Sequence, residues 1–206
     1  MTLVNAKAFF DRARNSDLLG PVLVQAEIDG CNAILAACAG WPMAHTAYAL
    51  ATAYHETGGT MQPVKEFGGA NYLRREYDVE GRDPARAKAH GNVKPGDGVK
   101  FCGRGYVQLT WQVNYAKAAR KVGVDLVADP DAAMRPSIAA CVMRDGMAEG
   151  WFTGKKLADY LPADGAASRD AFTKARRIIN GVDKADKIAE HAMDFQEALM
   201  AGGWSS

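Results

Sequence analysis

Residues 42–59 read PMAHTAYALATAYHETGG, an apolar run that ends in two glycines. Pro42 suits the first turn of a helix, and a glycine pair commonly ends one. We therefore expect a helix from Pro42 to His55, with Glu56 at its carboxyl-terminal end. The glycines let the backbone turn sharply there and let a substrate come close to it.

Apolar residues at helical spacing predict six further helices. These cover Val4 to Ala13, Pro21 to Ala39, Asn114 to Val122, Ser137 to Phe152, Ser168 to Ile179 and Ala185 to Met200. The middle of the chain, from Glu56 to Trp111, is different because it is rich in glycine and aromatic residues. It predicts helical turns near Asn71–Tyr77 and Pro84–His90, and a short hairpin or irregular strands over Val99–Thr110. Long irregular segments are usually functional. We expect a mainly α protein, one domain over residues 1–206, with a cleft walled by this segment.

Composition limits the possible function classes. The 206 residues are 48% hydrophobic and 24% charged, with a formal net charge of +1, which is the balance of an ordinary globular protein. Bulk charge gives no argument for nucleic-acid binding. The start, MTLVNAKAFFDRARNSD, lacks a secretory pattern, and the most apolar stretch, Ala33 to Ala39, is far too short to span a membrane. We expect a cytoplasmic product without nucleic-acid partner or stable membrane insertion.

The four cysteines favour reduced, mostly buried thiols over a disulfide framework. They are Cys31, Cys38, Cys102 and Cys141. The alternative is a bridge from Cys31 to Cys38 or a reactive thiol. These two cysteines lie about two turns apart on the expected helix, which is too far to bridge without unwinding it.

Glu56 is the first candidate for chemistry. The negative end of the helix dipole and partial burial both disfavour the charged carboxylate, and a general acid must hold its proton. The alternative is a glutamate paired with a nearby arginine at a helix end. His55 and Glu56 begin a zinc-binding pattern, but residue 59 is glycine where the second histidine should stand. We expect no metal site and no cofactor.

Glu66, ten residues further on, is the second candidate. Hydrolysis of a glycosidic bond needs two carboxyl groups, one to protonate the leaving oxygen and one to activate water or stabilise charge. The alternative is a solvated loop glutamate beside Lys65. Other acidic residues of the same segment compete for the role: Glu76, Asp78, Glu80, Asp83 and Asp97.

The third candidate is the segment GRGYVQLTWQVNY, residues 103–115. Three of its side chains can hydrogen-bond to sugar hydroxyls, acetamides or water: Gln108, Thr110 and Asn114. Three aromatic rings offer faces for sugar rings: Tyr106, Trp111 and Tyr115. Arg104 could pair with a catalytic carboxylate. The alternative is a strand and a helix start with aromatic residues in the core. A fourth segment, RRIING at residues 176–181, predicts a helix cap at Asn180 and Gly181.

Four segments, in this order, resemble glycoside hydrolase family 19, which includes plant-type chitinases and phage endolysins. They are HETGG, NYLRREYDVEGRDPARAKAHGNVKPGDG, GRGYVQLTWQVNY and RRIING, and together they extend from about Trp41 to Gly181. The second segment is more similar to the phage and bacterial branch. The resemblance implies a lysozyme-like, two-lobed helical domain with a central cleft, a small irregular β-hairpin region and an inverting reaction.

The resemblance also implies roles for single residues. Glu56 matches the general acid, Glu66 the general base, and Thr110 the residue that holds the attacking water. Gln108, Asn114 and Asn180 match sugar-binding positions. We further expect substrate contacts from His55, Arg104, Tyr106 and Trp111. The family often has an arginine one turn before an aromatic residue on the last helix, where this chain has His191 before Phe195.

The resemblance implies a β-1,4 N-acetylaminosugar polymer as substrate. We expect a phage-type endolysin, a lysozyme-like monomer that cleaves peptidoglycan glycan strands between N-acetylmuramic acid and N-acetylglucosamine. It would wait in the host cytoplasm until a membrane pore opens. Three alternatives stay open: a chitinase, a lytic transglycosylase and a non-catalytic wall-binding domain.

Overall fold

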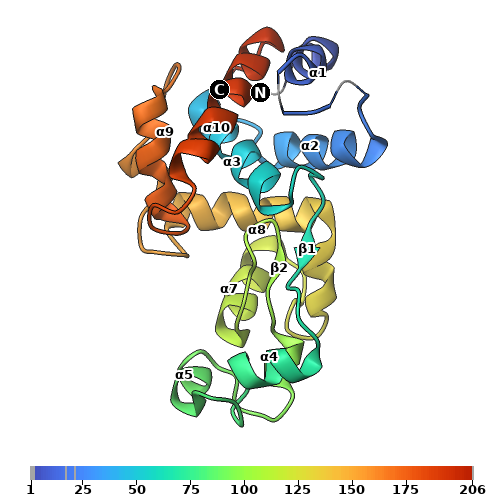
Figure 1. Cartoon of the computed structure of the whole chain (residues 1–206), viewed down its shortest axis with the longest axis vertical. Helices are drawn as coiled ribbons and strands as arrows, with labels where there is room; N and C mark the ends of the chain where they lie inside the picture. The colour runs from blue at the N-terminus through green and yellow to red at the C-terminus, as the bar shows by residue number, and fades with distance from the viewer. Residues whose placement is uncertain (1–2, 17, 21, 206) are drawn as a thin grey trace. The chain divides into compact units, whose positions relative to one another are not determined.

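The computed structural model describes residues 3–16, 18–20 and 22–205. The chain is mainly helical and has one small sheet in this part, so the expected mainly α class is confirmed (Figure 1). It divides into two compact units. We call residues 1–62 and 143–206 unit 1, and residues 63–142 unit 2. The single catalytic domain over the whole chain stays a prediction.

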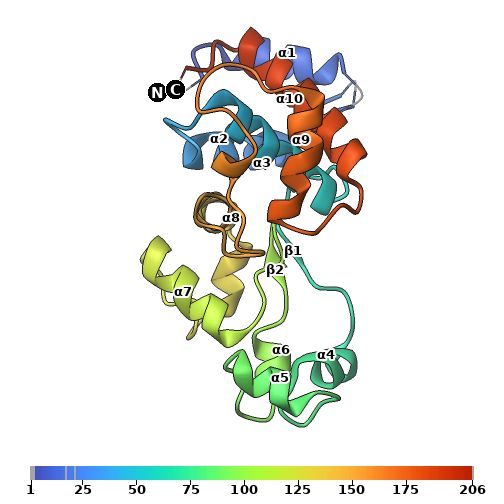
Figure 2. The same cartoon turned by 90° about the vertical axis from the view of Figure 1, so that its left-hand side faces the viewer.

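Unit 1 is built from helices alone in its described part. Its α-helices are α1 (Ala6–Arg14), α2 (Gln25–Ala37), α3 (Met43–Glu56), α9 (Arg169–Ala175), α10 (Ala185–Ala201) and the second half of α8 (Pro136–Glu149). Two short 3-10 helices, η2 (Leu157–Asp159) and η3 (Arg176–Ile178), complete it. Both views of the ribbon show α10 lying along α3, with α9 beside α10 (Figures 1 and 2).

Unit 2 contains the only strands among the described residues. In chain order it has β1 (Val64–Lys65), α4 (Ala70–Tyr77), α5 (Pro84–Ala89), α6 (Asp97–Lys100), β2 (Arg104–Gly105), α7 (Gln112–Val122), η1 (Pro130–Met134) and the first half of α8. The strands pair antiparallel, with Val64 opposite Gly105 and Lys65 opposite Arg104.

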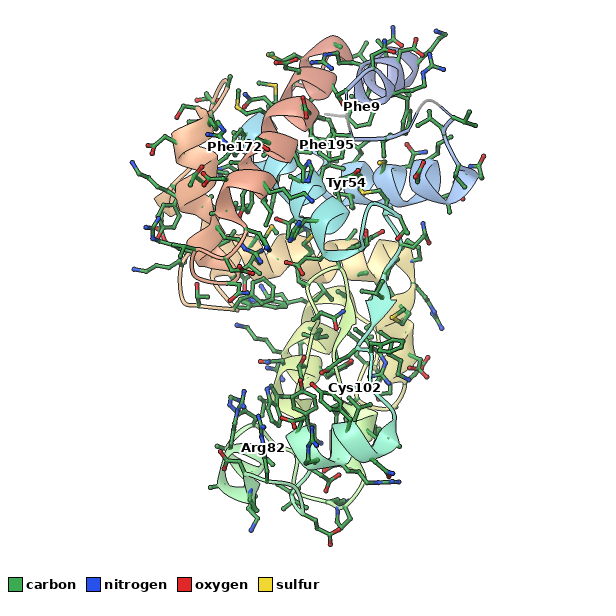
Figure 3. The ribbon with its side chains drawn as sticks, in the orientation of Figure 1. Phe9, Tyr54, Arg82, Cys102, Phe172 and Phe195 are labelled. Carbon is green, nitrogen blue, oxygen red and sulfur yellow. The ribbon has the colours of Figure 1, made fainter. Side chains whose placement is uncertain are left out.

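Helix α3 forms the core of unit 1. Every residue from Thr46 to Ala53 is buried, so this helix is covered all round rather than along one stripe. Tyr54, the next residue, packs edge-on against Phe195 of α10, with ring centroids 6.1 Å apart (Figure 3). Tyr48 stacks on Phe172 of α9 at 6.2 Å. These contacts fix the end of α3, where Glu56 lies.

A glycine of α2 fixes the chain just after α3. A Cβ atom on Gly30 would lie 1.8 Å from the carbonyl oxygen of Met61, so only glycine allows this close approach. Gln62 adds a hydrogen bond from Nε2 to the carbonyl oxygen of Ala26. The segment that leads from unit 1 towards β1 therefore begins from a packed position on α2.

The helices expected from the sequence agree with the structure within a few residues at most ends. Pro21, where one expected helix began, lies outside the described residues. The expected hairpin over Val99–Thr110 is wrong in extent, because α6 contains Val99 and only two residues of this stretch pair with β1. Arg104 and Leu109 exchange backbone hydrogen bonds of 3.2 and 2.8 Å across a tight loop instead.

The cysteines occur in the structure as free thiols. Cys31, Cys38 and Cys102 are buried, Cys141 is half-buried, and no disulfide joins any of the described residues. The expected thiols are confirmed. Burial raises the pKa of Cys31 to about 12, which makes it an unreactive group.

Within the described residues, no helix has the length and apolar character that a membrane span requires.

Candidate functional site

The end of α3 is fixed by a hydroxyl cap. Thr57 donates from Oγ1 to the carbonyl oxygen of Ala53 (2.8 Å) and accepts from the backbone N–H of Met61 (3.0 Å). Gly58 and Gly59 follow with φ of +61° and +89°, a left-handed conformation that glycine adopts at little cost. The sequence of this turn therefore determines where the last helical residue, Glu56, is placed.

Glu56 is held by a buried cation. Its Oε1 accepts a hydrogen bond from Nη1 of Arg176 at 3.0 Å, while its side chain stays 25% exposed. The Arg176 side chain is only 3% exposed, and its Nε donates to the carbonyl oxygen of Asp183 at 3.0 Å. A guanidinium group anchored at two points has little freedom, so it orients the carboxyl group. Part of Glu56 remains accessible to a ligand.

The ion pair answers a question that the sequence left open. A glutamate paired with an arginine at a helix end was the alternative interpretation of Glu56, and this pair is present. The arginine comes from the segment RRIING, for which the sequence indicated only a helix cap. His191, in the place where the family often has arginine, instead packs its ring 4.8 Å from that of Tyr54. Arg176 is four residues before Asn180, so the motif itself carried the signal.

Two other predicted residues of unit 1 lie near this pair in the chain. Asn180 is exposed and its backbone N–H donates to the carbonyl oxygen of Arg176 at 3.1 Å. His55 is half-buried, and burial lowers its pKa while the charge of Glu56 acts in the opposite direction. Both residues keep accessible surface, as a substrate contact requires.

Glu66 lies directly after β1 and is held by two donors. The Tyr77 hydroxyl donates to Oε1 at 2.7 Å, and the backbone N–H of Gly103 donates to Oε2 at 3.1 Å. Burial, followed by this contact with Glu66, raises the pKa of Tyr77, so its hydroxyl is a donor at neutral pH. Lys65, the partner in the alternative interpretation, pairs with Asp131 instead. Glu66 is thus an oriented, half-buried carboxyl group rather than a solvated one.

The competing acidic residues have structural partners. Glu76 pairs with Arg75 and Arg82. The other side chains accept hydrogen bonds from backbone N–H groups of turns and helix starts: Asp78 from Glu80, Gly96 and Gly98, Asp83 from Arg86, and Asp97 from Val93 and Lys94. Glu80 is exposed. Glu66 remains the best candidate for a second catalytic carboxyl group.

Gly103 brings Glu66 and Gln108 together. A Cβ atom on Gly103 would lie 2.6 Å from Oε1 of Gln108 and 3.2 Å from Oε2 of Glu66. The two side chains therefore cover the glycine from the same side. Gln108 is also held by its Nε2, which donates to the carbonyl oxygen of Val64 at 3.0 Å.

A chain of hydrogen bonds leads on from Gln108. The Thr110 hydroxyl donates to the carbonyl oxygen of Gln108, and Nδ2 of Asn114 donates to that of Thr110, each at 2.8 Å. Since the Thr110 hydrogen is in use, its oxygen is left to accept a hydrogen bond. Gln108 and Trp111 have φ of +52° and +77°, a conformation that costs a non-glycine residue about 1–3 kcal/mol and is often found at functional sites.

Several predicted contacts are wrong. Arg104 pairs with neither candidate carboxylate. It is buried and donates to Asp131 at 2.7 Å and to the Tyr115 hydroxyl at 2.9 Å. The three rings expected to face sugars, Tyr106, Trp111 and Tyr115, are 0%, 7% and 0% exposed, as in the alternative of core aromatics. Trp111 stacks on the His90 ring at 4.8 Å, and Tyr115 packs against Phe101 at 5.5 Å, so these two rings support the loop from within.

Exposed aromatic residues lie elsewhere in unit 2. Phe67, next to Glu66, is 100% exposed, and Tyr72 of α4 is 38% exposed. A ring exposed in this way can pack on a sugar. Phe67 was not among the predicted residues, although its place directly after Glu66 was a signal that could have identified it. No cluster of three or more metal-ligating side chains occurs in residues 3–16, 18–20 and 22–205.

Sequence comparisons match this chain to one protein family. The model of the family described as chitinase class I, glycoside hydrolase family 19, matches residues 42–153, more than half of the chain. An endochitinase of Arabidopsis thaliana is 36% identical over 86 residues, which make up 41% of this chain and 26% of that protein. The match therefore spans about a quarter of the plant relative.

Two solved structures are similar in fold. Chitinase C from Streptomyces griseus has a TM-score of 0.60 at 21% identity, covering 96% of this chain and 77% of that one. A bacterial family 19 chitinase has a TM-score of 0.52 at 20% identity, covering 98% and 96%. At these identities the likeness concerns the fold alone.

Proposed function

The chain belongs to glycoside hydrolase family 19, and from this membership we propose that it hydrolyses the β-1,4 bonds of an N-acetylaminosugar polymer with inversion. One observation carries the proposal. Both candidate carboxyl groups, Glu56 and Glu66, are oriented by donors that are themselves fixed, and both keep accessible surface. Preorganised groups of this kind are what acid–base catalysis requires.

Each carboxyl group has its own role. Glu56 donates a proton to the glycosidic oxygen as the bond to the anomeric carbon breaks. Glu66 accepts a proton from a water molecule, whose oxygen attacks the anomeric carbon from the opposite face. The free acceptor site of Thr110 can take the second hydrogen of that water. No metal or organic cofactor enters this reaction.

The acid and the base can be tested by two variants. We expect Glu56→Gln to lower kcat by about 10³-fold, and Glu66→Gln by a similar factor, because each removes a proton-transfer group. Proton NMR of the first product should show the α-anomer, as inversion of a β-bond demands. The control is Glu80→Gln, which changes an exposed carboxyl group of unit 2, the unit of Glu66, and should keep full activity.

The results also separate this proposal from two alternatives. A lytic transglycosylase needs only the acid, so activity in Glu66→Gln together with anhydro-sugar ends would replace our mechanism by that one. A non-catalytic binding domain would show its full biological effect in a folded Glu56→Gln variant. The circular dichroism spectrum of each variant must match that of the wild type.

We propose the peptidoglycan glycan strand as the substrate, cleaved between N-acetylmuramic acid and N-acetylglucosamine. The similarity of residues 71–98 to the phage and bacterial branch supports this choice. Chitin is the second candidate, and the comparisons favour it because the similar proteins are named chitinases. Mass spectrometry of digested peptidoglycan decides between them. New reducing ends support our choice, and turnover of chitin oligomers without such ends would reject it.

The endolysin role is a proposal of the same kind. The enzyme would act as a monomer and reach the wall from the host cytoplasm through a separate membrane pore. Expression in a bacterial host with and without a pore-forming protein tests this. We expect lysis only when the enzyme and the pore-forming protein are expressed together. An absence of lysis in their joint presence would contradict the role. Light scattering of the purified protein checks the monomer.

A further inference from the structure

Unit 1 contains a cavity at the end of α3 that the proposed reaction does not use. Its volume is about 410 Å³, in the range of sites for small ligands. The lining side chains and glycines come from the end of α3, the turn after it and α10: Tyr54, His55, Gly58, Gly59, Lys187 and His191. His55 directly precedes Glu56 in the chain, so the cavity lies at the same end of α3 as the candidate acid.

The lining is basic. Lys187 is exposed and positively charged at neutral pH, and none of the lining residues named above is acidic. Burial lowers the pKa of both His55 and His191, so near neutral pH each ring is uncharged and can donate one N–H. The charged groups that act on these rings from around the cavity include Glu56, Arg176, Asp183 and Glu190. One ammonium group and two imidazoles form a set of donors suited to a carboxylate.

The walls make the donor set more rigid than a surface lysine alone. The His191 ring packs edge-on against Tyr54 at 4.8 Å, and Tyr54 is fixed in turn by Phe195 and by its hydroxyl bond to the carbonyl oxygen of Leu18 (Figure 3). Gly59 is tied to α3 by its N–H bond to the Tyr54 carbonyl oxygen at 2.8 Å. The floor of the cavity is therefore held in place before any ligand arrives.

We propose that this cavity binds a carboxylate carried by the muramic acid residue of peptidoglycan, with Lys187 as its principal contact. The inference rests on the proposed function and deepens it. Chitin is a chain of uncharged N-acetylglucosamine units. Every muramic acid instead carries a lactyl group, and this group either ends in a carboxylate or continues into a peptide stem with carboxylates of its own. Lys187 is thus a specificity-determining residue that favours peptidoglycan over chitin.

The experiment compares three substrates: peptidoglycan with intact stems, the same strands after an amidase has removed the stems, and chitin oligomers. We expect Lys187→Ala to lower the ratio of kcat/KM for stem-bearing strands to that for chitin oligomers by about 10-fold, mainly through KM, and Lys187→Glu to lower it by about 100-fold. Lys155→Ala, an exposed lysine of the same unit outside the cavity, should leave the ratio unchanged.

The stem-free strands identify the source of the carboxylate. In intact strands the lactyl carboxyl group forms the amide bond to the stem, so it is a free carboxylate only on the stem-free strands. A Lys187 effect confined to stem-bearing strands assigns the stem carboxylates, and one that appears on the stem-free strands assigns the lactyl carboxylate; both results support the cavity as an anion site. An equal loss on all three substrates, or an unchanged ratio to chitin oligomers for both kinds of strand, would overturn the proposal.

A binding measurement keeps this test separate from the proposed function. The Glu56→Gln protein should bind a soluble muramyl peptide, followed by NMR shifts of the Gly58 and Gly59 amides, and Lys187→Ala in that background should weaken binding about 10-fold. Binding without turnover in the wild type would reject the hydrolase alone. Turnover of peptidoglycan with no shift at either amide would reject the cavity alone.

Discussion

At the scale of single residues, two side chains outside the predicted set orient the candidate carboxyl groups. Tyr77 donates to Glu66, and Arg176 to Glu56. Both were present in motifs that the sequence singled out, but a motif shows order along the chain and not which atoms meet. Arg104 shows the same limit, since it pairs with Asp131 rather than with a catalytic group.

Tyr77→Phe tests the orientation of Glu66. The variant loses one hydrogen bond to a charged acceptor, so we expect kcat to fall about 10-fold, with KM nearly unchanged. Tyr72→Phe, on the same helix, is the control. A fall in kcat no larger than that of Tyr72→Phe would show that Tyr77 does not orient Glu66.

Arg176→Lys tests the orientation of Glu56. Lysine keeps the charge but cannot bond to Glu56 and to the Asp183 carbonyl oxygen in the same fork-like geometry. We expect kcat/KM to fall by about 10- to 100-fold through misplacement of the acid. The neighbouring exposed residue provides the control, as Arg177→Lys should retain activity. Equal activity of the two variants would remove Arg176 from the proposed mechanism.

At the scale of elements, short backbone features matter more than long helices. The β1–β2 pair has two residues in each strand, yet it places Glu66 over Gly103. The sequence predicted a short hairpin or irregular strands over Val99–Thr110, which contains β2 but not β1, and it gave the helices of both units nearly correct bounds. It could not give the pairing of β1 with β2, because the hydrogen bonds join residues about 40 positions apart.

Gly103→Ala tests this element. The added methyl group would lie 2.6 Å from Oε1 of Gln108, so the amide and Glu66 must move. We expect kcat to fall about 100-fold. The free energy of unfolding, from urea titration, should drop by about 1–3 kcal/mol. Gly69→Ala has open space around the new atom and is the matched control. Unchanged kcat in Gly103→Ala would contradict the packing described here.

At the scale of the whole molecule, three histidines of unit 1 make the free energy of unfolding depend on pH. Burial is the first cause that lowers the pKa of His45, His55 and His191 below the ordinary value of 6.5. The unfolded chain then binds more protons than the folded one just below pH 6.5. The stabilisation from the three uncharged histidines is therefore fully present above pH 6.5. It is lost as the pH falls below 6.5 towards the pKa values of the folded chain.

Urea unfolding at about pH 7.5 and about pH 5.5 measures this effect. Both pH values lie above the ordinary pKa of carboxyl groups, so these contribute little to the difference. We expect the free energy of unfolding to be lower at the acidic pH, because rings that are uncharged in the folded chain take up protons when the chain unfolds. A protein with both His45→Gln and His191→Gln should show a smaller difference between the two pH values. An equal or larger difference would contradict the assignment to these histidines.

The sequence by itself determined the helical class, the position of Glu56 at a helix end and the order of the family motifs, because helix periodicity and glycine turns are local properties of the chain. The tertiary structure alone decided which arginine holds Glu56, that Tyr77 and Gly103 hold Glu66, that the rings of residues 106, 111 and 115 are buried, and that Lys187 shares a cavity with two histidines. These outcomes depend on contacts between residues far apart in the chain, and packing, not local preference, sets which of them form.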